Sequence, residues 1–139
     1  MPVTRETLRI VLVENDPDDL FFLQRALTQG GFVNPLVHLW DGMEAIDYLS
    51  TFSSPPSGLP DIILTDLKMP RMDGLDFLRW LRGESRLKDL PVIVLTSSSD
   101  PSDMRRTGHM GVFKFVTKQV HYDNVISTLE LFLSYLNRP

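Results

Sequence analysis

The chain has 139 residues, 42% hydrophobic and 23% charged, which is the length and composition of one globular domain. Its 14 Lys and Arg residues against 18 Asp and Glu residues give a net charge of −4, which argues against a nucleic-acid binder that relies on bulk positive charge. Cysteine is absent, and no apolar run is long enough for a membrane span or a secretory signal. We therefore expect one soluble, cytoplasmic domain over residues 1–139.

The N-terminal part of the chain predicts a strand followed by a helix. The run Leu8–Val13 is aliphatic and β-branched, as is typical of a buried strand. Asp16 and Pro17 then supply an N-cap and a first-turn proline, and the helical period of leucines that follows ends at Gly30–Gly31.

The next segment repeats this order of elements. Leu36–Trp40 predicts a second strand, and Asp41 with Glu44 resembles a capping box at the start of a short second helix. Thr51–Pro60 is rich in proline and serine and predicts a loop. Ile62–Asp66 predicts a third strand, which ends in an acid.

The second half of the chain predicts two further strands and three helices. A third helix follows Asp73–Gly74, and Pro91–Thr96 predicts the fourth strand. A weak helix is expected over residues 100–108, followed by a fifth strand at Val112–Val116 and a last helix at Tyr122–Asn137.

Strands that alternate with helices predict an α/β domain with a doubly wound parallel sheet. Such a sheet is covered on both faces, which explains the nearly continuous apolar runs. Because ligands of these folds bind at the carboxyl ends of the strands, the residues that end the strands are the candidate functional residues.

Acidic, hydroxyl and amino side chains follow four of the predicted strands. These side chains are Glu14, Asn15, Asp66, Thr96 and Lys118. Carboxylate and carbonyl oxygens are ligands that Mg²⁺ prefers, and a carboxylate can act as a nucleophile toward phosphorus. A lysine and a hydroxyl can stabilise phosphoryl oxygens, so this edge predicts a site for Mg²⁺ and a phosphoryl group.

Four segments of the chain resemble the motifs of a response-regulator receiver domain. The segments are Val13–Asp19, Leu64–Gly74, Pro91–Thr96 and Phe115–Lys118. The chain is similar to stand-alone receivers that are paired with bacterial and cyanobacterial phytochrome histidine kinases. The resemblance implies a flavodoxin-like, five-stranded parallel sheet of order 2-1-3-4-5 with five helices. No output domain is expected, because the chain ends at Pro139.

The resemblance also implies a role for each residue of the site. Asp66 would accept a phosphoryl group from the phosphohistidine of a sensor histidine kinase, in a reaction that needs Mg²⁺. The implied metal ligands are Glu14, Asn15, Asp66 and the backbone carbonyl of Lys68. Thr96 and Lys118 would bind the phosphoryl oxygens, and Phe115 would move when Thr96 is drawn inward. The chain would be a phosphoacceptor rather than an enzyme with its own substrate.

Two residues depart from the family pattern. Asn15 stands where the family usually has a second acid, which should weaken Mg²⁺ binding. An alternative reading places Asp16 in that role, but it conflicts with Asp16 as an N-cap. Gln119 stands where the family usually has a cis-proline, and a cis bond before a non-proline residue costs about 2.5–4 kcal/mol.

These departures keep two other functions open. The first is a phosphorylation-independent docking module with a receiver fold, which Asn15 and Gln119 favour. The second is an aspartyl-phosphate hydrolase of another fold, which Lys68 disfavours because such enzymes need an acid two residues after the nucleophile.

The last predicted helix has more apolar residues than one buried stripe requires. The stripe consists of Val125, Leu129, Phe132 and Leu136. Leu131 and Tyr135 fall outside this stripe, which indicates an association surface, although isolated exposed apolar residues are also normal on monomers. Together with the family resemblance, this favours a symmetric homodimer.

The remaining polar candidates have simpler interpretations. His38, His109 and His121 are too dispersed in the sequence for a metal cluster. Arg82 and its basic neighbours are expected to form a solvated helix face.

Overall fold

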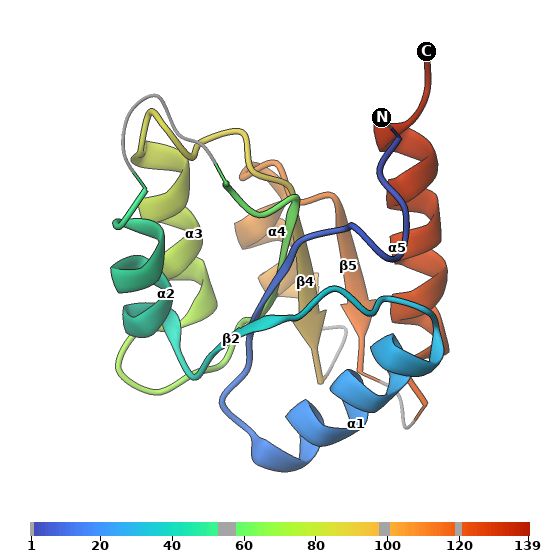
Figure 1. The fold of residues 1–139 in the computed structure, drawn as a ribbon. Coiled ribbons are helices and arrows are strands. Elements are labelled where there is room, and N and C mark those ends of the chain that lie inside the picture. Colours follow the sequence, from blue (N-terminus) through green and yellow to red (C-terminus); the bar gives the residue numbers. More distant parts are fainter. Residues whose placement is uncertain (1, 53–57, 98–100, 119–120) are drawn as a thin grey trace.

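The computed structural model describes residues 2–52, 58–97, 101–118 and 121–139. Within these residues, strands and helices alternate along the chain (Figure 1). The strands are β1 (Ile10–Val13), β2 (Val37–Leu39), β3 (Ile62–Asp66), β4 (Val92–Thr96) and β5 (Lys114–Thr117). The helices are α1 (Pro17–Gln29), α2 (Gly42–Leu49), α3 (Gly74–Gly83), α4 (Pro101–Gly108) and α5 (Asp123–Leu136).

All described strand pairs are parallel, and the sheet has the order β2-β1-β3-β4-β5. The predicted flavodoxin-like architecture is therefore confirmed. The β5 strand begins at Lys114, two residues later than expected, although the Phe113 N–H still donates to the Val92 carbonyl at 2.8 Å. The central part of the expected loop Thr51–Pro60, and also Asp100 and Gln119, lie outside the described residues.

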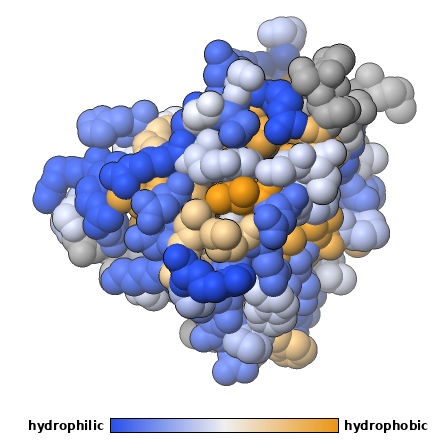
Figure 2. Space-filling model, turned by 90° about the vertical axis from the view of Figure 1, so that its left-hand side faces the viewer, coloured by the Kyte–Doolittle hydropathy of each residue, from blue (hydrophilic) through white to orange (hydrophobic). Residues whose placement is uncertain are grey.

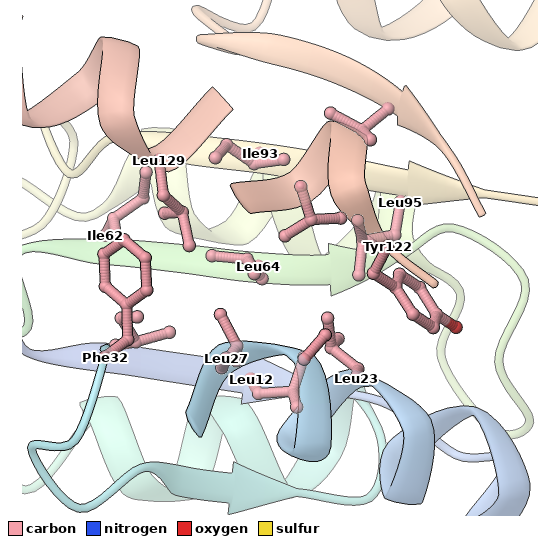
Figure 3. Close-up of a cluster of buried hydrophobic side chains, with 14 of the residues drawn as sticks. Leu12, Leu23, Leu27, Phe32, Ile62, Leu64, Ile93, Leu95, Tyr122 and Leu129 are labelled. Atoms are coloured by element: carbon pink, nitrogen blue, oxygen red, sulfur yellow. The ribbon is translucent and has the colours of Figure 1, made fainter. Parts of the chain in front are cut away.

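The two faces of the sheet are covered by different helices, because successive residues of a strand point to opposite faces. Ile10 and Leu12 of β1 point to the face covered by α1 and α5, whereas Val11 and Val13 point to the face covered by α2 and α3. Figure 3 shows the first of these clusters, with Leu23 and Leu27 of α1 and Leu129 of α5 packed over β3 and β4. This three-layer packing holds the carboxyl ends of the strands at one edge of the molecule.

Side-chain hydrogen bonds cap the N-termini of α1 and α2, as the sequence predicts. Asp16 Oδ1 accepts hydrogen bonds from the N–H groups of Asp18 and Asp19 at 2.8 and 3.1 Å, so Asp16 is the N-cap of α1. Asp41 Oδ1 accepts from the Glu44 N–H at 2.9 Å, while the Glu44 carboxylate accepts from the Trp40 N–H, one residue before the cap. This is a variant of the expected capping box.

A close approach of the backbone after β3 requires glycine at position 74. A Cβ atom on Gly74 would lie 2.6 Å from the Cα atom of Leu67 and still closer to the carbonyl oxygen of Asp66. The Gly74 N–H also donates to the Leu67 carbonyl at 2.6 Å. The loop therefore folds back tightly onto the end of β3, which fixes the backbone around Asp66.

Arg82 is not a solvated side chain, which corrects the expectation from the sequence. Its guanidinium donates to the carbonyls of Met110 at 2.6 Å, Lys88 at 2.9 Å, Leu90 at 2.8 Å and Gly111 at 3.3 Å. Arg82 thus joins the end of α3 to the segments that precede β4 and β5.

None of the helices in the described ranges is long and apolar enough to cross a membrane.

Candidate functional site

The carboxyl edge of the sheet carries the polar residues that the sequence analysis singled out. Glu14 follows β1 directly, and Asp66 is the last residue of β3. Thr96 ends β4, and its carbonyl accepts a hydrogen bond from the Lys118 N–H at 2.8 Å, just after β5. Because the strands are parallel, these residues from four strands lie together at the carboxyl edge of the sheet.

The Lys118 ammonium lies at the centre of this cluster. Lys118 Nζ is 2.7 Å from Glu14 Oε1, 2.8 Å from Asp66 Oδ2 and 2.8 Å from Asp19 Oδ2. The Glu14 side chain is fully buried, those of Lys118 and Asp66 are each 11% exposed, and that of Asp19 is 37% exposed. One largely buried ammonium thus faces three carboxylates.

The second carboxylate oxygens of Glu14 and Asp66 are held by backbone N–H groups. Glu14 Oε2 accepts from the Asn15 N–H at 2.9 Å, and Asp66 Oδ1 accepts from the Lys68 N–H at 3.2 Å. Glu14 Oε2 also accepts from the Asp16 N–H, at 3.5 Å. Both carboxylates are therefore oriented by the Lys118 ammonium together with backbone N–H donors.

Burial and charge shift the pKa values of the cluster in a consistent way. Burial raises the pKa of Glu14 to about 7; Lys118 opposes this increase, whereas Asp66 and Asp19 add to it. Burial alone would lower the pKa of Lys118, but its hydrogen bonds to Asp19, Asp66 and Glu14 outweigh burial and raise that pKa well above its usual value. Lys118 therefore keeps its charge, whereas Glu14 can take up a proton near neutral pH.

The other predicted site residues occupy different environments. Thr96 is buried at the end of β4, the Asn15 side chain is half-buried, and that of Lys68 is exposed. Phe115 is half-buried on β5 and packs against the cluster below α2 and α3. Of the predicted site residues, Glu14 and Asp66 are each in direct contact with Lys118.

Leu131 and Tyr135 do not belong to this site. Their exposed fractions are 52% and 47%, and Tyr135 packs on Phe113, which precedes β5 at the opposite edge of the sheet. The predicted exposure of both residues is confirmed, whereas Leu136, expected in the buried stripe, is exposed at the end of α5.

The sequence analysis did not single out Asp19, an acid in the first turn of α1, as a site residue. The available signal was its place in the helix turn that directly follows Glu14 at the end of β1. His38 was also missed: its Nε2 donates to the Glu14 carbonyl at 2.8 Å, and its ring meets Trp40 edge to face at a centroid distance of 4.4 Å. Strand pairing explains this contact, because His38 on β2 lies beside Leu12 on β1.

Two further residues border the site. Tyr122 is 3% exposed, and Figure 3 shows its ring at the carboxyl end of the strands with the hydroxyl pointing away from the leucines. Burial, with a contribution from Asp19, raises the pKa of the Tyr122 phenol to about 12. Arg71, with φ of 67°, donates from Nε to Asp41 Oδ2 at 2.8 Å and so ties the loop after β3 to the start of α2.

The donor set fits Mg²⁺ chemically, because carboxylate, amide and carbonyl oxygens are hard ligands. Among the described residues, however, no group of three acidic or histidine side chains is arranged to hold a metal ion. Lys118 Nζ contacts the carboxylates of both Glu14 and Asp66. An ion that binds both carboxylates must compete with this ammonium.

Comparisons with known proteins agree with the fold. A model of the response regulator receiver domain matches residues 10–130. The probable methanogenesis regulatory protein FilR2 of Methanothrix harundinacea is 32% identical over 126 residues, which cover 91% of this chain and 81% of FilR2. The chain spans about half the length (51%) of several other curated response regulators that it matches.

Solved structures give the same result. The bacteriophytochrome response regulator AtBRR is 36% identical, with a TM-score of 0.77 and coverage of 95% of this chain and 96% of AtBRR. The Mn²⁺-bound form of the response regulator Rcp1 is 28% identical, with a TM-score of 0.75 and the same coverage of both chains. Since the family model spans most of the sequence, the chain belongs to the response regulator receiver domain family of two-component signalling.

Proposed function

We propose that this chain is a response regulator in which Asp66 accepts a phosphoryl group from the phosphohistidine of a sensor histidine kinase. The observation that carries the proposal is the Asp66 carboxylate at the end of β3, with Oδ2 2.8 Å from the Lys118 ammonium. An Asp66 oxygen forms the bond to phosphorus while the P–N bond to histidine breaks, and the electron pair of that bond stays on the imidazole. The phosphorylated chain then signals through protein contacts.

The residues around Asp66 have defined tasks in this transfer. Lys118 neutralises negative charge on the phosphoryl oxygens. To do so, its ammonium must give up a contact with one carboxylate and donate to a phosphoryl oxygen instead. Thr96 lies one position beyond Leu95, which pairs with Asp66 in the sheet, and we assign its hydroxyl to the phosphoryl group. Phe115, half-buried on the neighbouring strand, is assigned as the side chain that moves with Thr96.

Mg²⁺ is the proposed metal, held by Glu14, Asn15, Asp66 and the backbone carbonyl of Lys68. When bound, it would supply positive charge that offsets the charge of the phosphoryl oxygens. The Mn²⁺-bound form of Rcp1 supports a divalent ion in a similar protein. Asn15 contributes a neutral oxygen in place of a carboxylate, so binding should be weak.

The proposed phosphodonor is a bacteriophytochrome histidine kinase in the cytoplasm. The similarity to AtBRR, a bacteriophytochrome response regulator, supports this class of partner. Phosphotransfer from candidate kinases is the experiment that identifies the partner.

We also propose a homodimer that uses Leu131 and Tyr135 of α5. Figure 2 shows that hydrophilic residues predominate on the α2 and α3 face, with a small apolar patch at its centre. Leu131 and Tyr135, by contrast, expose about half of their surface. Leu131→Glu combined with Tyr135→Glu should convert a dimer to a folded monomer; a wild-type sedimentation mass near 15.9 kDa would refute the dimer.

Labelling with a small phosphodonor tests the proposed function. Wild type should incorporate phosphate in the presence of Mg²⁺, and Asp66→Asn should not, because this nearly isosteric change removes the nucleophile. Asp89→Asn, at an exposed aspartate on the opposite edge of the sheet, is the control and should label normally. Unchanged labelling of Asp66→Asn would refute the assignment. An unlabelled wild type that still binds a histidine kinase would instead support the docking module.

A further inference from the structure

Asp19 is the carboxylate of the site that no part of the proposed reaction uses. It lies in the first turn of α1, and its Oδ2 is 2.8 Å from Lys118 Nζ, although the two residues are 99 positions apart in the sequence. Its side chain is 37% exposed, so it forms the solvent side of the cluster, whereas Glu14 forms the buried side.

The neighbouring acids of the same turn have other positions. Asp16 Oδ1 caps α1 by accepting from two N–H groups, so this carboxylate is already engaged. Asp18 is exposed and forms no ion pair within the described part of the chain. Asp19 is thus the acid of this turn that reaches Lys118.

The ammonium of Lys118 has three N–H donors, and three carboxylates accept from it. Two of these acceptors, Glu14 and Asp66, are also the carboxylates that must turn toward a divalent cation and a phosphoryl group. When they do so, Lys118 loses attraction to them and is repelled by the incoming cation. Asp19 is then the carboxylate that can keep Lys118 beside the site.

We propose that Asp19 is a positioning residue that holds the Lys118 ammonium at the edge of the site while Glu14 and Asp66 bind the divalent cation. Asp19 thereby supplies the negative charge that neutral Asn15 does not. This inference rests on the proposed function. It assigns to Lys118 two successive positions: shared among three carboxylates before the cation binds, and on Asp19 afterwards.

A Mg²⁺ titration of matched variants tests the proposal without any phosphoryl transfer. Trp40 fluorescence, measured with Trp80 replaced by phenylalanine in every variant, is a suitable signal, because Trp40 packs on His38 and His38 bonds to the Glu14 carbonyl. Asp19→Asn should weaken Mg²⁺ binding about fivefold, the scale of one partly exposed ion pair. Asp18→Asn removes the same charge from the same helical turn and should change the affinity less than about twofold.

Repeating the Mg²⁺ titrations of Asp19→Asn and Asp18→Asn in a Lys118→Met background tests whether Asp19 acts by holding Lys118 or only through its own negative charge. If Asp19 acts by holding Lys118, Asp19→Asn should lose most of its effect once the ammonium is absent. An equal effect with and without Lys118 would overturn the proposal, as would equal effects of Asp19→Asn and Asp18→Asn. Asp19→Glu keeps the charge and should bind Mg²⁺ within about twofold of wild type.

Labelling with a small phosphodonor at saturating Mg²⁺ gives a second, independent reading. Asp19→Asn should slow labelling severalfold, because Lys118 then stays on the nucleophilic carboxylate of Asp66, while Asp18→Asn should label at the wild-type rate. An unchanged rate for Asp19→Asn would count against the positioning role. If no form labels at all, the proposed function fails, but the metal titrations still decide the role of Asp19.

Discussion

Replacing Lys118 with methionine is the perturbation that bears most directly on the charge arrangement of the site. Methionine has a similar length but no charge, so Lys118→Met leaves Glu14, Asp66 and Asp19 facing one another without an ammonium. Removing one partner of a buried ion pair typically costs about 3–5 kcal/mol, because the other charge stays buried and uncompensated. The cost here should depend on pH, because Glu14 can be neutralised by a proton.

The sign and size of that dependence follow from the pKa of Glu14. Burial already raises this pKa to about 7 in the wild type, and loss of Lys118, which opposes the increase, must raise it further. A raised folded-state pKa contributes stability that is present below the unfolded value and is lost as pH rises through the folded value. Wild type completes this loss near pH 7, whereas Lys118→Met continues to lose stability above pH 7, by at most about 1.4 kcal/mol per pH unit.

Urea unfolding of the metal-free protein at pH 6 and pH 9 measures this difference. The stability gap between wild type and Lys118→Met should be larger at pH 9 than at pH 6, by up to about 3 kcal/mol, and Mg²⁺ should reduce the gap by replacing the missing positive charge. Lys114→Met, at an exposed lysine on β5, is the control and should stay within about 0.5 kcal/mol of wild type. A gap that is independent of pH and of Mg²⁺ would show that Lys118 acts only through packing.

Three further predictions concern neighbouring positions. Asn15→Asp places a carboxylate at the proposed metal position and should tighten Mg²⁺ binding about tenfold by calorimetry; equal affinities would mean that another ligand already fills this role. Gly74→Ala should destabilise the fold by about 2–4 kcal/mol in urea, because its Cβ would lie 2.6 Å from Leu67 Cα, whereas Gly83→Ala meets no atom within 4 Å and should be neutral or stabilising. Glu14→Gln removes the buried carboxyl, so the metal-free wild type should lose about 3 kcal/mol relative to this variant between pH 4.5 and pH 7; parallel stability curves would contradict the raised pKa of Glu14.

The elements and the central cluster were predictable because they follow from local patterns and one topological rule. Apolar runs that end in polar residues define the strands, and parallel strands deliver their carboxyl ends to the same edge. Glu14, Asp66 and Lys118 therefore meet although they come from distant segments of the chain. The N-caps Asp16 and Asp41 were equally predictable, because the backbone N–H groups that donate to their carboxylates lie within three residues.

Asp19 and Arg82 could not be assigned from the sequence, because local physics already explains both. An acid in the first turn of a helix is stabilised by the helix dipole, so Asp18 and Asp19 look equivalent until Lys118 is placed beside one of them. From the sequence alone, Arg82 is expected to be solvated. Only the folded chain places the carbonyls before β4 and β5 within hydrogen-bond distance of its guanidinium. Tertiary contacts decide both roles.

The most direct test of the central claim is to map the phosphorylated residue by mass spectrometry after incubation with a phosphorylated histidine kinase and Mg²⁺. Borohydride reduction marks an aspartyl phosphate, so the modified position can be read from the peptide masses. Our account predicts a single modified residue, Asp66, and no modification in Asp66→Asn. Modification of another residue, or none with any kinase that binds the chain, would contradict it.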